Sequence, residues 1–314
     1  MADRRMVLGV DGGGTSTVAW LADPGGEVLG RGASGPSNAK AVGMESARRA
    51  LDAAIAAAFA DAGIGPATVE TACLGLAGFD RPEDRAIVVG WAGEVGLARR
   101  LVLVNDGDLV VAAGTPEGWG VGVIAGTGSI AVGRSADGRT ARAGGWGHLI
   151  GDEGSGYRLV LDALRLVARR DDGRDPRPDP DPLTDRLCRA LGVDRASRIV
   201  TAVYAPDSTR ARIAAMAPEV LAACDESPDD ARCLLRPAGV ALAEIVAAVA
   251  RSLGWHSGPL PMAAAGSFLL AAPAVRLSMI DDLLARGYRP DLNPVPEPAR
   301  GAVLLAARAT DESP

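Results

Sequence analysis

The 314-residue chain contains one lysine, Lys40, although lysine and arginine together number 33. Lys40 lies in the segment Ser-Asn-Ala-Lys-Ala, which does not have the G-x-x-x-x-G-K-[ST] pattern. In that pattern the lysine reaches the β- and γ-phosphates of a bound nucleotide. A Walker-type phosphate loop is therefore excluded, and any nucleotide site in this chain must hold phosphate with other groups.

Histidine and cysteine are also scarce, with two histidines and four cysteines. The cysteines form no C-x-x-C pair, and neither His148 nor His256 lies near one in the sequence. A structural zinc site needs four clustered ligands, so we interpret the cysteines as buried, reduced thiols. The H-E-x-x-H and G-x-S-x-G patterns are absent as well, which removes support for zinc peptidase and α/β-hydrolase chemistry.

Long hydrophobic runs and a strong charge excess are missing too. No apolar run reaches about 18 residues without polar interruption, so we predict no membrane-spanning helix. The amino end meets aspartate and glycine too early for a signal peptide. A formal charge of −6 gives no general attraction to nucleic acid or to anionic membranes. We therefore expect a cytoplasmic protein without nucleic-acid or membrane partners.

An internal duplication is the most informative feature that is present. Residues 6–32 and 121–143 both read as a strand, a glycine turn with hydroxyls, a second strand, a tight turn and a third strand. Two copies predict two related domains, which we place at residues 1–115 and 116–297. A helix at about residues 298–310 is expected to pack back on the first domain.

The segments around the two copies alternate between helical and strand patterns. Such alternation predicts an α/β fold. Helices are predicted at residues 44–60, 82–95, 157–170, 209–224, 228–253 and 298–309, and further strands at residues 72–77, 101–104 and 262–265.

The two glycine turns are candidate phosphate-binding sites. Asp11-Gly12-Gly13-Gly14-Thr15 follows an apolar strand, and three glycines without Cβ atoms let backbone N–H groups approach an anion. Thr15 adds a hydroxyl, and Asp11 could hold a hydrated Mg²⁺; an ordinary hairpin turn is the alternative. Gly126-Thr127-Gly128-Ser129 is the matching turn. It also fits a dinucleotide fingerprint, but a strand rather than the required helix is expected after it.

Further candidate residues lie in three other segments. Asp106 follows the buried strand at residues 101–104, where open α/β sheets place ligands, although Asn-Asp-Gly is also a common turn. Residues 144–156 combine six glycines with Trp146, Asp152 and Glu153, a combination suited to binding a sugar. Gly266-Ser267 after a strand is a third glycine turn, or a helix start capped by the serine.

Six motifs occur in an order that resembles the BadF/BadG/BcrA/BcrD-type ATPase group and, within it, the N-acetylglucosamine kinases. They are D-G-G-G-T (11–15), L-G-L-A-G (74–78), N-D-G (105–107), G-T-G-S (126–129), G-G-W-G-H-x-x-G-D-E-G-S (144–155) and A-G-S (265–267). The resemblance extends from residue 6 to about residue 308. It implies two ribonuclease H-like (actin-like ATPase) domains with ATP and sugar in a central cleft.

The resemblance also implies roles for individual residues. Asp106 would be the general base for the sugar 6-hydroxyl. ATP and Mg²⁺ would contact Asp11 (the metal, through water), Gly12, Gly13, Gly14, Thr15, Gly126, Thr127, Gly128, Gly266 and Ser267. The sugar would contact Asn38, Asp106, Gly145, Trp146, Gly147 and Asp152.

The resulting hypothesis is an ATP-dependent kinase for N-acetylglucosamine or glucosamine, with N-acetylmuramic acid also open as a substrate. A homodimer is usual for the family that the chain resembles. The alternative is a regulatory ATPase that drives a partner protein. Two related groups fit less well, because the zinc-binding cysteines of ROK-type sugar kinases and the cluster-holding cysteines of dehydratase activators have no counterpart here.

Overall fold

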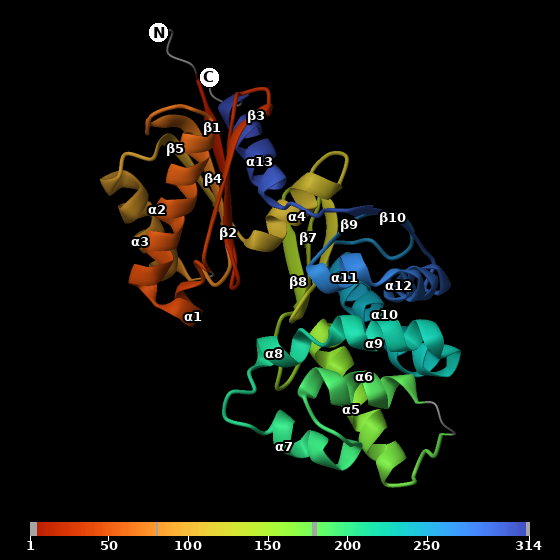
Figure 1. The fold of residues 1–314 in the computed structure, drawn as a ribbon. Helices are drawn as coiled ribbons and strands as arrows, with labels where there is room; N and C mark the ends of the chain where they lie inside the picture. The colour runs from red at the N-terminus through yellow and green to blue at the C-terminus, as the bar shows by residue number, and fades with distance from the viewer. Residues whose placement is uncertain (1–4, 80, 178–180, 312–314) are drawn as a thin grey trace. The chain divides into compact units, whose positions relative to one another are not determined.

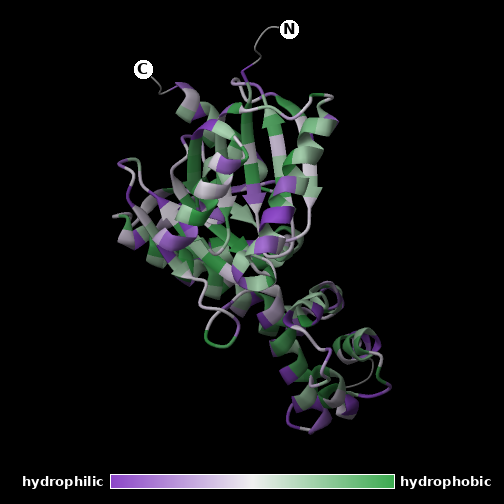
Figure 2. Ribbon diagram, turned by 90° about the vertical axis from the view of Figure 1, so that its left-hand side faces the viewer, coloured by the Kyte–Doolittle hydropathy of each residue, from purple (hydrophilic) through white to green (hydrophobic). Residues whose placement is uncertain are grey.

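The computed structural model describes residues 5–79, 81–177 and 181–311. The chain divides into two compact units: unit 1 comprises Met1–Trp119 and Glu297–Pro314, and unit 2 comprises Gly120–Pro296. Each unit contains one five-stranded sheet flanked by helices (Figure 1), so the predicted α/β class is confirmed. The strands are coloured mostly as hydrophobic in Figure 2, as expected for sheets covered by helices.

The sheet of unit 1 has the strand order β3-β2-β1-β4-β5. Its strands are β1 (Val7–Gly12), β2 (Thr17–Ala22), β3 (Val28–Ser34), β4 (Val69–Leu76) and β5 (Ala98–Val104). The first three pair antiparallel, whereas β4 is parallel to both β1 and β5. Because parallel strands end at the same edge, residues that follow β1 and β5 are brought close together. Asp11 pairs with Gly75, which pairs in turn with Val104.

Side chains of β1 alternate between the two faces of this sheet, since successive residues of a strand point in opposite directions. Leu8 packs in a core with α2 (Met44–Asp61) and α3 (Pro82–Glu94). Val7 packs on the other face with α4 (Asp106–Gly114) and α13 (Ala299–Asp311). The four-residue helix α1 (Ala39–Val42) precedes α2.

Helix α13 lies very close to the backbone of its neighbours. A Cβ atom on Gly9 of β1 would lie 2.5 Å from the backbone nitrogen of Val303, and one on Gly301 would lie 2.0 Å from the carbonyl oxygen of Leu109. Real Cβ atoms do not approach backbone atoms so closely. Glycine at these two positions therefore allows α13, from the far end of the chain, to seat on β1 and α4.

The sheet of unit 2 repeats this arrangement, with the order β10-β9-β6-β7-β8. Its strands are β6 (Gly120–Ala125), β7 (Ser129–Arg134), β8 (Thr140–Gly144), β9 (Gly258–Ala265) and β10 (Tyr288–Pro294). The first three are antiparallel and β9 is parallel to β6, as β4 is to β1. Strand β10 was not predicted from the sequence, and its polar residues and two prolines are tolerated because it lies at the edge of the sheet.

Helices make up most of the remainder of unit 2. They are α5 (Gly156–Asp171), α6 (Pro182–Leu191), the 3₁₀ helix η1 (Ala196–Arg198), α7 (Ile199–Val203), α8 (Arg210–Ala214), α9 (Ala217–Glu226), α10 (Pro228–Ser252), α11 (Ser267–Ala271) and α12 (Pro273–Ala285). The single helix expected at residues 209–224 is in fact α8 and α9. Pro218 explains the break, because proline fits the first turn of a helix but not its interior.

Helix α10 departs from the expectation that no segment could span a membrane. By length and composition it qualifies, with a mean hydropathy of 1.8 over its most apolar window. Half of that window is nevertheless buried inside the unit, where Leu242, Val246 and Val249 are fully buried in the core and the helix packs on α12. Such burial is that of a core helix.

The close packing of α13 gives a first prediction. Gly301→Ala should lower the free energy of unfolding by about 1–3 kcal/mol, because the new methyl group collides with the Leu109 carbonyl. Gly90→Ala is the matched control: Gly90 is also helical, in α3, but it is exposed and no atom lies within 4 Å of its Cβ position. That change should stabilise by up to about 1 kcal/mol. Equal effects in urea unfolding would contradict the packing argument.

Candidate active site

The first glycine turn joins β1 to β2 as a hairpin. Gly13 N–H donates to the carbonyl of Ser16 at 2.9 Å. Gly12 is closely packed here, since its Cβ would lie 2.5 Å from Ser37 Oγ. Gly14 and Thr15 are exposed at the tip. The tip of the turn, Gly14 and Thr15, therefore exposes backbone and the Thr15 hydroxyl to solvent, whereas Gly12 is buried.

Asn38 is held against the base of this turn. Its backbone N–H and that of Ser37 donate to the Gly13 carbonyl at 3.2 and 3.1 Å. The side-chain Oδ1 of Asn38 caps α1 by accepting from Lys40 N at 3.1 Å. Gly78 lies beside the amide with a φ of +83°, and a Cβ there would come within 2.7 Å of that Oδ1. The hydrogen bonds to the turn, the cap of α1 and the contact with Gly78 together fix the position of the Asn38 side chain.

Asp106 is the first residue of α4, directly after β5. Its Oδ1 accepts from the Gly107 N–H at 2.9 Å, and Asp108 Oδ2 accepts from the Asn105 N–H at 3.2 Å. The Asn-Asp-Gly segment is therefore a capped helix start, and its interpretation as a simple turn is wrong. Helix α4 was not predicted from the sequence because its first residues have turn composition. A helix amino terminus also favours a carboxylate.

Asp11 and Asp106 interact electrostatically at this edge of the sheet. Burial, and then the negative charge of Asp106, raise the pKa of Asp11 to about 7. Two carboxyl groups that resist ionising together favour a nearby cation. No group of three or more potential metal-ligating side chains occurs in residues 5–79, 81–177 or 181–311. Carboxyl oxygens are donors that suit Mg²⁺, which takes one or two carboxylates and completes its shell with water and phosphate oxygens.

The second glycine turn, between β6 and β7, lies beside the third, Gly266-Ser267. Gly126 N–H donates to the Gly128 carbonyl at 2.9 Å. Ser267 Oγ would lie 3.8 Å from a Cβ on Gly126, and Gly266, with a φ of +94°, lies against Ala125. Gly266 rather than Ser267 is the N-cap of α11, so the serine-cap interpretation is wrong. A strand follows Gly128, as expected, and so the dinucleotide fingerprint lacks its helix.

The glycine-rich loop after β8 exposes its tryptophan. Gly145 and Gly147 have φ values of +70° and +83°, and Trp146 between them is 65% exposed. Tryptophan is usually well buried, so an exposed indole on a loop marks a surface that can stack on a ligand. The Arg142 guanidinium lies 5.9 Å from the ring centroid, and His148 packs edge-on against Tyr157.

Asp152 at the end of this loop is buried and strained. It is 3% exposed, and with a φ of +62° it is the only non-glycine in the described ranges with a left-handed backbone. Its Oδ1 accepts from the Ser129 N–H at 3.2 Å, and its Oδ2 lies 2.9 Å from Nη2 of Arg210. Such a conformation persists at functional sites when the surroundings enforce it. Sequence reasoning missed Arg210, which carries no motif.

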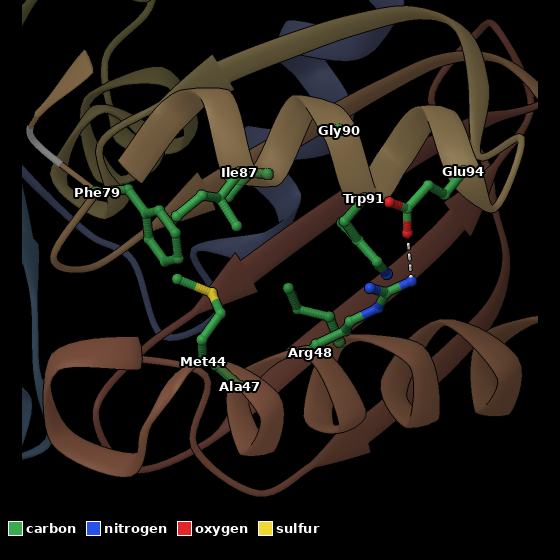
Figure 3. A pocket seen from close by; sticks show the side chains of 10 residues that line it. Met44, Ala47, Arg48, Phe79, Ile87, Gly90, Trp91 and Glu94 are labelled. Atoms are coloured by element: carbon green, nitrogen blue, oxygen red, sulfur yellow. Dashed lines mark hydrogen bonds and ion pairs between the residues drawn. The ribbon is translucent and has the colours of Figure 1, made fainter. Parts of the chain in front are cut away.

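An apolar cavity of about 250 Å³ lies apart from these residues (Figure 3). It opens between α2 and α3, where Met44, Phe79 and Ile87 face one another, and the Arg48–Glu94 ion pair bounds one end at 2.8 Å. None of the predicted site residues lines it. The predicted residues instead form two groups, one in each unit: Asp11–Thr15, Asn38 and Asp106 in unit 1, and Gly126–Gly128, Gly145–Gly147, Asp152 and Gly266–Ser267 in unit 2.

Comparison with known proteins gives a consistent result. The family model described as "BadF/BadG/BcrA/BcrD ATPase family" matches residues 8–306. An N-acetylmuramic acid/N-acetylglucosamine kinase of Clostridium acetobutylicum is 30% identical over 84% of this chain and 86% of its own length. An N-acetyl-D-glucosamine kinase of Dictyostelium discoideum is 30% identical over 80% of this chain and 81% of its own.

Solved structures share the fold. A candidate N-acetylglucosamine kinase from Chromobacterium violaceum has a TM-score of 0.74 and 30% identity, covering 96% of this chain and 99% of its own. A ROK family glucokinase from Streptomyces griseus, solved with glucose and AMPPNP, has a TM-score of 0.57 at 20% identity, covering 96% and 98%. The latter likeness shows that the glucokinase has the same overall fold as this chain.

The raised pKa of Asp11 gives a second prediction. The carboxyl binds its proton up to about pH 7 in the folded protein but only to about pH 4 when unfolded. The contribution of Asp11 to the free energy of unfolding is therefore largest at low pH. It falls as pH rises from about 4 to 7, by up to about 1.4 kcal/mol per pH unit. Asp11→Asn should remove this fall. Urea unfolding from pH 5 to 8 tests it, and parallel curves for the two proteins would refute it.

Proposed function

The chain belongs to the BadF/BadG/BcrA/BcrD ATPase family, and from that membership we propose that it is an ATP-dependent kinase for the 6-hydroxyl of N-acetylglucosamine or glucosamine. One observation carries the proposal: Asp106 stands at the carboxyl edge of the unit 1 sheet, where its charge acts on a second, partly buried carboxyl, Asp11. Relatives that share 30% of their residues with most of this chain are named as kinases of amino sugars.

Asp106 is assigned the role of general base. Its carboxylate accepts the proton of the 6-hydroxyl while the sugar oxygen forms a bond to the γ-phosphorus of ATP. The bond from that phosphorus to the bridging oxygen breaks, and ADP leaves. Phosphoryl transfer asks the protein mainly for positioning and for stabilisation of negative charge. The amino terminus of α4 supports the role, because it orients the carboxylate and its Oδ1 is already held by the Gly107 N–H.

The three glycine turns are assigned to the nucleotide. In unit 1, the turn Gly12–Thr15 would hold phosphate oxygens through the backbone N–H groups of Gly14 and Thr15 and the Thr15 hydroxyl, because these two residues are exposed at the tip. In unit 2, Gly126–Gly128 has the same hairpin form, and Gly266 with Ser267 adjoins it. Asp11 would hold Mg²⁺ through water, and the cation would offset charge on the phosphates. The repulsion between Asp11 and Asp106 supports this assignment, because a bound cation would relieve it.

The remaining predicted residues are assigned to the sugar. Trp146 offers an exposed apolar face for the sugar ring. Gly145 and Gly147 flank the tryptophan and would also contact the sugar. Asn38 and Asp152 offer amide and carboxylate groups to sugar hydroxyls, and both are fixed by their neighbours. ATP and a free amino sugar as substrates also favour a cytoplasmic location. A homodimer remains our expectation from the family.

Removal of the base gives a third prediction. Asp106→Ala should reduce turnover by about 10²–10⁴-fold, because a general base contributes about that much. The melting temperature should change little, and Asp281→Asn, on the exposed side of α12, serves as the control. Activity of the Asp106 variant near that of the unaltered protein would contradict the assignment.

The substrate is tested by the release of ADP from Mg-ATP, without sugar and then with N-acetylglucosamine, glucosamine, glucose or N-acetylmuramic acid. Strong stimulation by one amino sugar is expected and would identify the substrate. The family description also allows a regulatory ATPase that drives a partner protein. ATP hydrolysis that is indifferent to every sugar would favour that second function over the kinase.

A further inference from the structure

Arg210 reaches Asp152 from a separate part of unit 2. It opens the short helix α8, which packs on α5, whereas Asp152 ends the glycine-rich loop. The guanidinium Nη2 lies 2.9 Å from Asp152 Oδ2, and the side chain of Asp152 is almost fully buried. A buried carboxylate is costly without a charged partner. Arg210 is the cation that the structure provides for it.

The same guanidinium lies against the second glycine turn. A Cβ atom on Gly128 would fall 2.5 Å from Arg210 Nη2 and 2.8 Å from Asp152 Oδ1. Only glycine leaves room for this approach. The turn assigned to the phosphates and the carboxylate assigned to the sugar are therefore in direct contact with one arginine.

The contacts of Asp152 leave one acceptor for a ligand. Oδ1 is occupied by the Ser129 N–H. Oδ2 is buried and accepts no hydrogen bond from any described residue, although Arg210 forms an ion pair with it. A buried acceptor without a donor costs free energy unless a ligand supplies one. A sugar hydroxyl would do so.

We propose that Arg210 is a positioning residue that holds Asp152 for the sugar and cancels its charge beside the phosphate-binding turn. Without the arginine, a buried negative charge would stand next to Gly128, where the polyphosphate is expected, and would repel it. With the arginine, Asp152 accepts a sugar hydroxyl and the turn stays open to an anion. The inference rests on the proposed kinase function.

The cavity beside Arg210 makes the substitution practicable. Arg210 is one wall of a cavity of about 790 Å³, which α5 lines with Tyr157 and Leu161. Truncation of the side chain enlarges a space that already exists and creates no sealed void in the core. Arg210→Ala should therefore fold, with a melting temperature lowered by the unpaired charge of Asp152 and not by a new cavity.

The fourth prediction is a change in both Michaelis constants. Arg210→Ala should raise KM for the amino sugar and KM for Mg-ATP by at least about 10-fold each, since the buried Asp152 carboxylate loses its charged partner. Arg210→Lys keeps the charge and should restore KM for Mg-ATP more fully than KM for the sugar. Arg212→Ala is the matched control. Arg212 lies two residues along the same helix, is exposed and pairs with Asp207, so both constants should stay unchanged.

A double variant separates charge cancellation from a merely structural role. Asp152→Asn added to Arg210→Ala removes the uncompensated charge, so KM for Mg-ATP should return to the value of Asp152→Asn alone. KM for the sugar should stay raised, because the carboxylate is gone. Unchanged constants in Arg210→Ala, or no recovery in the double variant, would overturn the inference. An unaltered protein that phosphorylates no sugar would instead overturn the proposed function.

Discussion

The proposed chemistry of this protein depends on the repulsion between two carboxyl groups at one edge of a parallel sheet. Strands β1, β4 and β5 run in the same direction, so Asp11 at the end of β1 and Asp106 just after β5 meet at that edge. Burial and the charge of Asp106 raise the pKa of Asp11 to about 7. A fold that keeps such a pair accepts a loss of stability that a bound cation and phosphate can recover. The pH dependence of stability therefore has the burial of Asp11 as its main cause and the charge of Asp106, the proposed base, as its second.

Unit 2 has the same strand arrangement, but the charged residues beside its hairpin turn are of opposite sign. Ser267 lies against its hairpin turn at Gly126, and the Asp152–Arg210 pair lies against the same turn at Gly128. The strained backbone of Asp152 directs a carboxylate to the turn, and a cation from α8 accompanies it. In unit 1 two like charges are brought together, whereas in unit 2 opposite charges are paired. The first arrangement calls for a cation from outside, and the second is neutral before any ligand binds.

The sequence predicted most of the framework because its signals are local. The repeated hairpins follow from glycine and aspartate turns between β-type runs, and both were found as β1–β3 and β6–β8. Failures occurred where tertiary contacts override local preference. Asn105 to Asp108 has turn composition but begins α4, whose Leu109 and Val110 are buried. The polar strand β10 is stabilised by its parallel pairing with β9, which no local pattern reveals.

The sequence by itself determined the duplication, the α/β class and the residue types at the candidate site, since turn chemistry and hydrophobic periodicity are written in neighbouring residues. Tertiary structure alone decided which of those residues influence one another. Residues as distant in sequence as Asp11 and Asp106, or Asp152 and Arg210, interact only through strand order and helix packing. Charge coupling falls off with distance in space and not along the chain. For that reason the pKa of Asp11 and the role of Arg210 could be inferred only from the folded protein.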